Sequence, residues 1–159
     1  MSVSTPVGSD HQLARLLQIG MVLEEVVEAR AHKHHETLED VSEDVIALLE
    51  EAAEESAEHR RRLEALVDEL EADPVAYEEI ERLVAAQYEA DTNTDGVLYD
   101  QLASEETAYK FYDDLIGAIE NSDVRFGIDR DRLLAVLREI RADEEDGVEA
   151  VTHLMEARE

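Results

Sequence analysis

The residues of this chain best suited to chemistry are four glutamates and one histidine that fall among apolar residues at helical spacing. Glu24, Glu105 and Glu144 each lie on an apolar stripe drawn at about 100° per residue. His59 lies on the centre line of a further stripe, and Glu55 precedes it by one helical turn. A buried carboxylate without a partner costs several kcal/mol or takes up a proton, and a shared cation removes that cost. We interpret these five residues as metal ligands, the alternatives being solvated glutamates and a histidine that bonds to a core neighbour.

Four long helices must position these side chains. Strong helix formers dominate the chain, which contains only 2 prolines and 6 glycines. Asp10, Ser42 and Asp129 are suitable capping residues at the start of three helices. Pro74 fits the first turn of a shorter helix, and the turn-rich segment 91–96 follows it. The pattern therefore predicts long helices over residues 10–38, 42–73, 97–120 and 129–159, with a short helix over 74–90.

The five candidate ligands also share one height along these helices. Glu24 and Glu55 each lie 13 residues from the turn that joins their two helices, and His59 lies 17 residues from it. Glu105 and Glu144 lie 16 and 15 residues from their own turn. At 1.5 Å per residue, every ligand is roughly 20–25 Å from its turn. Two hairpins joined by a long crossover, with inward ligands at one level, are typical of a ferritin-like di-metal carboxylate bundle.

Composition restricts the class of protein further. The 159 residues fit one domain, expected over residues 10–159 after a flexible leader at 1–9, and no segment is apolar enough to cross a membrane. The absence of cysteine excludes disulfides, thiolate catalysis and iron–sulfur clusters. A formal net charge of -28 disfavours nucleic acid as a partner. We expect a cytoplasmic protein of a high-salt cell, such as a halophilic archaeon, because salt screens the repulsion among its acidic side chains. We expect Arg60–Arg62 to form ion pairs with nearby glutamates.

The third predicted helix carries a pattern that resembles a known family. Glu105, Ala108 and Tyr112 place a small residue three positions and a tyrosine seven positions after a glutamate, which resembles the rubrerythrin-like proteins of the ferritin-like superfamily. The family's full ligand set is Glu, Glu-x-x-His, Glu and Glu-x-x-His. Two positions depart from it, because Ser56 replaces a glutamate and Gly147 replaces a histidine. The resemblance covers the bundle alone, without a rubredoxin domain.

The resemblance implies a function as well as a fold. It implies that the bundle binds iron, or manganese, and takes part in iron oxidation or in peroxide handling. Without a rubredoxin domain, a separate protein would have to donate electrons. Whether the incomplete ligand set supports oxidase or peroxidase activity stays open. We expect a homo-oligomer, with a dimer favoured. We also expect Tyr109 and Tyr112 to lie in the core; the alternative for these tyrosines is that a hydroxyl group lies beside the metal. The alternative function is a redox-inactive structural or interaction module with a degenerate metal site.

A second sequence feature suggests calcium only weakly. Asp91, Asn93 and Asp95, followed by Gly96, match the opening of an EF-hand loop. The twelfth position of such a loop is Leu102, where a bidentate glutamate would be needed. We favour an Asn/Asp/Gly turn between two helices over a calcium site.

Overall fold

The computed structural model describes residues 6–37, 42–72 and 97–157, together with the single positions 76, 78, 79 and 82. Four α-helices make up almost all of it: α1 (Asp10–Thr37), α2 (Glu43–Glu69), α4 (Val97–Glu120) and α5 (Arg130–Ala157). The described residues contain no strand, and the all-α four-helix bundle is confirmed. The short helix expected over 74–90 lies largely outside the described residues and stays a prediction. Among the described helices, none is both long and apolar enough to span a lipid bilayer.

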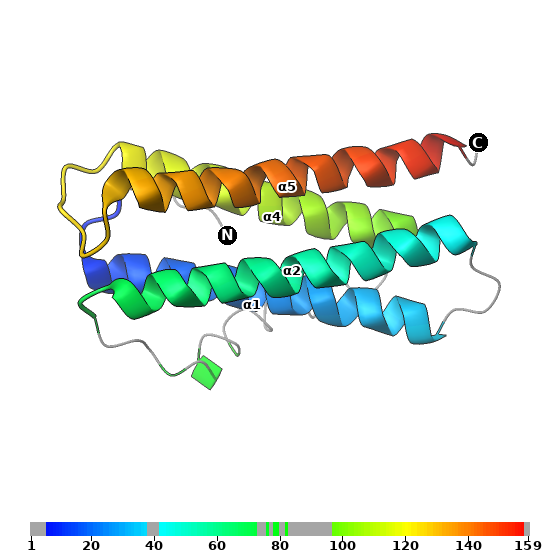
Figure 1. Ribbon diagram of the computed structural model, residues 1–159, viewed down its shortest axis with the longest axis horizontal. Helices are drawn as coiled ribbons and strands as arrows, with labels where there is room; N and C mark the ends of the chain where they lie inside the picture. The colour runs from blue at the N-terminus through cyan, green and yellow to red at the C-terminus, as the bar shows by residue number, and fades with distance from the viewer. Residues whose placement is uncertain are drawn as a thin grey trace.

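The helices form two antiparallel hairpins that pack against each other (Figure 1). α1 pairs with α2 and α4 pairs with α5, while α1 also contacts α4 and α2 contacts α5. α2 ends at one end of the bundle and α4 begins at the other, so these two helices run parallel (Figure 1). Residues 72 and 97 therefore lie at opposite ends of the bundle, and most of the expected crossover between them lies outside the described residues.

Two apolar clusters fill the bundle interior at different heights. The larger cluster includes Leu17, Leu63, Ile116 and Leu137, one from each helix and all at most 1% exposed. The smaller cluster contains Ala31, Val45, Leu49 and Ala53, with Leu98 and Leu154 packed against it. Along each helix, a set of buried polar residues lies between the residues of the two clusters: Glu24, Ser56, His59, Glu105 and Glu144. The core therefore has a polar layer between two apolar ones.

Gly20 brings α1 close to its neighbours one turn before the polar layer. A Cβ at Gly20 would lie 3.2 Å from Leu63 Cδ1 and 3.3 Å from Phe111 Cε1. Those distances are tighter than normal packing contacts, so a larger residue would push α1 away from α2 and α4. The close approach lets a glutamate on α1 reach residues of the neighbouring helices.

Asp10 has a different role from the capping role that we expected. The Ser9 hydroxyl accepts a hydrogen bond from the Gln12 amide at 3.1 Å, so Ser9 caps α1 and the Asp10 prediction is wrong. The Asp10 carboxylate instead accepts hydrogen bonds from the Gly127 amide at 3.0 Å and the Glu71 amide at 3.1 Å. It thereby ties the start of α1 to the end of α2 and to the loop before α5.

The segment before α1 is packed where the structure describes it. Val7 is fully buried, and its amide donates to the Ala118 carbonyl at 3.3 Å. The Ser122 hydroxyl donates to the Val7 carbonyl at 2.5 Å. Ordered structure therefore begins before residue 10, while residues 1–5, also part of the expected leader, lie outside the described residues.

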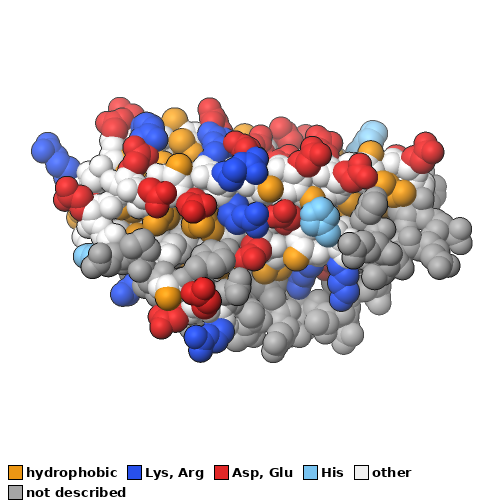
Figure 2. All heavy atoms as spheres, turned by 60° about the horizontal axis from the view of Figure 1, so that its bottom comes forward, with side chains coloured by type: hydrophobic (Ala, Val, Ile, Leu, Met, Phe, Trp, Pro, Cys, Tyr) orange, Lys and Arg blue, Asp and Glu red, His pale blue; other side chains and the backbone are white. Residues whose placement is uncertain are grey.

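Arginines stand among the acidic side chains that cover the surface, as Figure 2 shows for one face. The three consecutive arginines of α2 form the expected ion pairs, with Arg60 reaching Glu28 of α1 at 2.9 Å. Arg62 pairs with Glu139 of α5, while Arg61 pairs within its own helix. Each exposed ion pair contributes at most about 1 kcal/mol to the free energy of unfolding, so these contacts add little to the stability of the bundle.

Candidate metal centre

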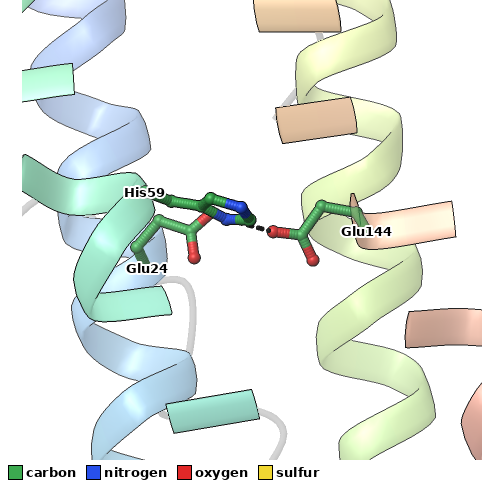
Figure 3. A group of neighbouring side chains, drawn as sticks. All are labelled: Glu24, His59 and Glu144. Carbon is green, nitrogen blue, oxygen red and sulfur yellow. Dashed lines mark hydrogen bonds and ion pairs between the residues drawn. The ribbon is translucent and has the colours of Figure 1, made fainter. Parts of the chain in front are cut away.

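His59 occupies the middle of the polar layer. Its side chain is 1% exposed, and its ring lies between carboxylates from α1 and α5 (Figure 3). Nδ1 is 3.3 Å from Glu24 Oε1 and 3.2 Å from Glu144 Oε1. Nε2 faces the other way, 2.9 Å from Asp143 Oδ2 and 4.0 Å from Glu55 Oε1. One imidazole therefore joins an inner and an outer pair of carboxylates.

Helical periodicity explains why these side chains converge. Glu24 lies seven residues after the buried Leu17 and seven before the buried Ala31. Glu144 has the same relation to Leu137 and Val151. Since seven residues are nearly two helical turns, each glutamate is carried inward with the apolar residues of its own stripe. His59 lies four residues, or about one helical turn, before the fully buried Leu63, so it also faces the interior.

Glu24 is the most deeply buried carboxylate of the chain's described part, with no exposed surface. Its Oε1 atom accepts a hydrogen bond from the Tyr112 hydroxyl at 2.7 Å and contacts His59. Its Oε2 atom is closed to solvent and has no hydrogen-bond partner among the described residues. A buried carboxylate oxygen with free lone pairs is costly unless a proton or a cation occupies it.

The two expected tyrosines differ in their relation to this group. Tyr112 is fully buried and orients Glu24 through its hydroxyl. Tyr109 is half-buried, and no hydrogen bond within the described residues joins it to the group. The difference arises because Tyr112 is seven residues after Glu105, whereas Tyr109 is four residues after it and lies at the edge of the stripe.

Glu105 reaches the same layer from α4. It is 6% exposed, and its Oε1 atom accepts a hydrogen bond from Gln101 Nε2 at 2.9 Å. Its carboxyl group also lies near that of Glu144 and affects the pKa of that group. Burial raises the pKa of Glu144 well above its usual value, and the charge of Glu24 and the contact with Glu105 raise it further. Without a cation, burial and these neighbours therefore favour the protonated form of the Glu144 carboxyl group.

The outer carboxyl groups, Glu55 and Asp143, affect the pKa of the His59 ring, and His59 in turn affects the pKa of Glu55. Burial raises the pKa of Glu55 to about 7, although the charge of His59 opposes this change. Burial alone would lower the pKa of His59, but its hydrogen bond and charge contact with Glu24, followed by Asp143 and Glu55, raise it to about 9. A single imidazolium faces four carboxyl groups, and Glu105 lies in the same layer, so the group carries an excess of negative charge that suits a cation.

Gly147 leaves the space that the Glu105 carboxylate fills. A Cβ at position 147 would lie 2.7 Å from both Cδ and Oε2 of Glu105, which is too close for any side chain without displacement of the carboxylate. The absence of a histidine at this position therefore also makes room for a ligand from α4. Ser56, the other departure from the family pattern, is buried at 4% exposure.

Asp143 and Gln101 belong to the group, although sequence reasoning missed both. Asp143 is half-exposed and precedes Glu144, so it lies at the edge of the α5 stripe, where the sequence gives little sign of an inward contact. Gln101 is 1% exposed and lies one turn before Glu105 on the α4 stripe, which is a signal that could have been used. The three residues of the expected calcium loop, Asp91, Asn93 and Asp95, lie outside the described residues.

Two sets of potential metal ligands meet at His59. The ligand atoms of Glu24, His59 and Glu144 lie within 4.8 Å of one another, and the same holds for Glu55, His59 and Asp143. No model of a known protein family matches the chain, and no curated protein or solved structure is significantly similar to it. Its function must therefore be argued from the chemistry of this site.

Proposed function

We propose that this chain is a ferritin-like, rubrerythrin-like protein that binds iron, or manganese, in the bundle interior and acts in iron oxidation or peroxide handling. The observation that carries the proposal is the Oε2 atom of Glu24, which is buried without a partner beside His59 and Glu144. These three side chains come from three different helices, so a cation among them would join the two hairpins. The location in a high-salt cytoplasm and the homodimer remain part of the proposal.

The donor set fits these metals. Carboxylate oxygens together with one imidazole nitrogen suit iron and manganese, whereas the chain offers no thiolate for softer ions. Glu24, His59 and Glu144 would hold the ion. Glu55, Glu105 and Asp143 would be near enough to bind a second ion or to occupy open coordination positions of the first. Iron bound here would supply redox chemistry with oxygen or peroxide, and a separate protein would have to supply electrons.

Protons that now balance the group must leave when a cation binds. His59 can offer a lone pair only after it loses the proton that its neighbours stabilise, and Glu144 must likewise ionise. The hydroxyl of Tyr112 keeps Glu24 oriented, which leaves the other oxygen of Glu24 free for the ion. Binding should therefore release protons and become tighter as the pH rises toward 9.

A degenerate site is the second candidate, and one observation favours it. Both ring nitrogens of His59 already have carboxylate partners, and the raised pKa of Glu144 favours a proton that removes another charge. Protons alone can thus neutralise part of the group. In that case the chain is a redox-inactive structural or interaction module.

Metal content separates the two candidates. Wild-type protein would be loaded with Fe²⁺ or Mn²⁺ without oxygen, desalted in high KCl and assayed by elemental analysis. Glu24→Gln removes the charge of one ligand while it keeps the shape of the side chain, and Glu64→Gln makes the same change at an exposed position of α2. We expect stoichiometric metal in wild type and Glu64→Gln, and its loss in Glu24→Gln. Equal metal content in all three proteins, or none in wild type, contradicts the proposal.

A further inference from the structure

A small pocket between α2 and α5 leads from the surface to Glu105. Its volume is about 80 Å³. The exposed residues Glu51 and Asp146 line its outer part, while its inner wall includes Glu105, which is only 6% exposed. Since a water molecule occupies about 30 Å³ in the liquid, the pocket has room for a few waters or a small ion and excludes an organic substrate.

The pocket exists because the helices carry small residues at this height. Gly147 and Ala150 of α5 face Ala52 of α2 across it. A side chain at Gly147 would collide with the Glu105 carboxylate and would also close the inner end. The lack of a side chain at position 147 therefore gives solutes access to the Glu105 carboxylate.

The charge of the pocket selects among small solutes. Glu51, Glu55 and Asp146 line it together with Glu105, and none of the described lining residues is a lysine or an arginine. Four carboxyl groups around so small a volume attract cations and repel anions. Because Glu55 also lies 4.0 Å from His59 Nε2, the pocket borders the outer set of ligands.

We propose that this α2–α5 pocket is the route by which divalent cations reach the buried carboxylates, and that it limits the substrates of the centre to small ions and molecules of a few atoms. The proposal rests on the metal-binding function proposed above and adds the path and the substrate class. It assigns a role to Glu51, Asp146 and Ala150, which contact none of the candidate ligands by a hydrogen bond within the described residues.

Rates of metal uptake test the route separately from affinity. Stopped-flow absorption would follow Co²⁺ binding in high KCl for wild type and for Ala150→Leu, which narrows the mouth of the pocket. Ala142→Leu makes the same change at an exposed position two turns earlier on α5. We expect several-fold slower uptake and slower release in Ala150→Leu with an unchanged dissociation constant, and wild-type rates in Ala142→Leu.

The charge of the route is tested by a double variant, Glu51→Gln with Asp146→Asn. Uptake should slow by roughly tenfold at low salt, and the difference from wild type should shrink in high salt. Wild-type rates in both this variant and Ala150→Leu overturn the route. An equal loss of rate and affinity in Ala150→Leu also overturns it, because the substitution then acts on the ligands.

A measurement that needs no buried metal keeps the proposal testable if the proposed function fails. Substoichiometric Mn²⁺ added to Glu24→Gln protein should broaden the amide NMR signals of Gly147 and Ala150 more than those of Glu43 and Asp131, which lie on other exposed acidic surfaces. Selective broadening supports a cation pathway in the pocket even without a working centre. Uniform broadening over the acidic surface contradicts it.

Discussion

Raising the pH of the metal-free protein should destabilise it through His59. The pKa of His59 rises from 6.5 to about 9 on folding, because the contacts with Glu24, Asp143 and Glu55 outweigh the effect of burial. A group with a raised pKa contributes stability that is complete below its unfolded pKa and is lost as the pH passes its folded pKa. The affected window therefore runs from about pH 6.5 to pH 9 and somewhat beyond.

The size of the effect follows from the two pKa values. A rise from 6.5 to about 9 corresponds to a contribution on the order of 3 kcal/mol at low pH. About 2 kcal/mol of this should disappear between pH 7 and pH 9. Glu55 acts in the same direction, since its pKa is raised from 4.5 to about 7, but most of its effect falls below pH 7. The pKa of Glu144 is also raised well above its usual value, so Glu144 acts in the same direction, and a variant at position 59 is needed to separate the contribution of His59.

Urea unfolding at fixed high KCl, with a chelator present, measures this loss. The salt screens the self-repulsion that comes from the net charge of -28. His59→Gln should reduce the loss of unfolding free energy between pH 7 and pH 9 by about 2 kcal/mol, whereas His153→Gln, at an exposed position of α5, should retain the full loss. A wild-type unfolding free energy that is equal at pH 7 and pH 9, or higher at pH 9, refutes the reasoning. An unchanged slope in His59→Gln refutes it as well.

Three further substitutions test particular contacts. Tyr112→Phe removes the donor to Glu24 Oε1 and should lower the unfolding free energy of metal-free protein by about 1–3 kcal/mol in urea titrations. Leu63→Ala opens a cavity in the larger apolar cluster and should cost about 2–5 kcal/mol by the same assay, without changing metal stoichiometry. Gly147→Ala should change stability by less than about 1 kcal/mol, since better helix propensity offsets the displacement of Glu105, yet it should weaken Mn²⁺ binding in calorimetric titrations.

The fold could be predicted because the chain repeats one strong signal. Apolar residues recur at helical spacing over four long segments, and Pro and Gly are scarce within them. The helix ends depend on single hydrogen bonds and were harder to predict. Asp129 caps α5 by accepting from the Arg132 amide at 3.1 Å, as expected, whereas Ser9 rather than Asp10 caps α1. Both residues of the pair Ser9–Asp10 are good caps, and sequence alone does not distinguish them.

The inner part of the site could be predicted for the same reason. Glu24, His59 and Glu144 lie within the apolar stripes of their helices, so periodicity alone carries them inward. Asp143 lies at a stripe edge, and its contact with His59 depends on how α5 is rotated against α2. Rotation about a helix axis is set by packing between helices, which the pattern of one helix does not specify.

Anomalous scattering from crystals grown with Mn²⁺ tests the central claim most directly. The account predicts a single strong peak, or a close pair of peaks, within coordination distance of Glu24, His59 and Glu144. An ordered site without such a peak, or manganese only on the acidic surface, would contradict it.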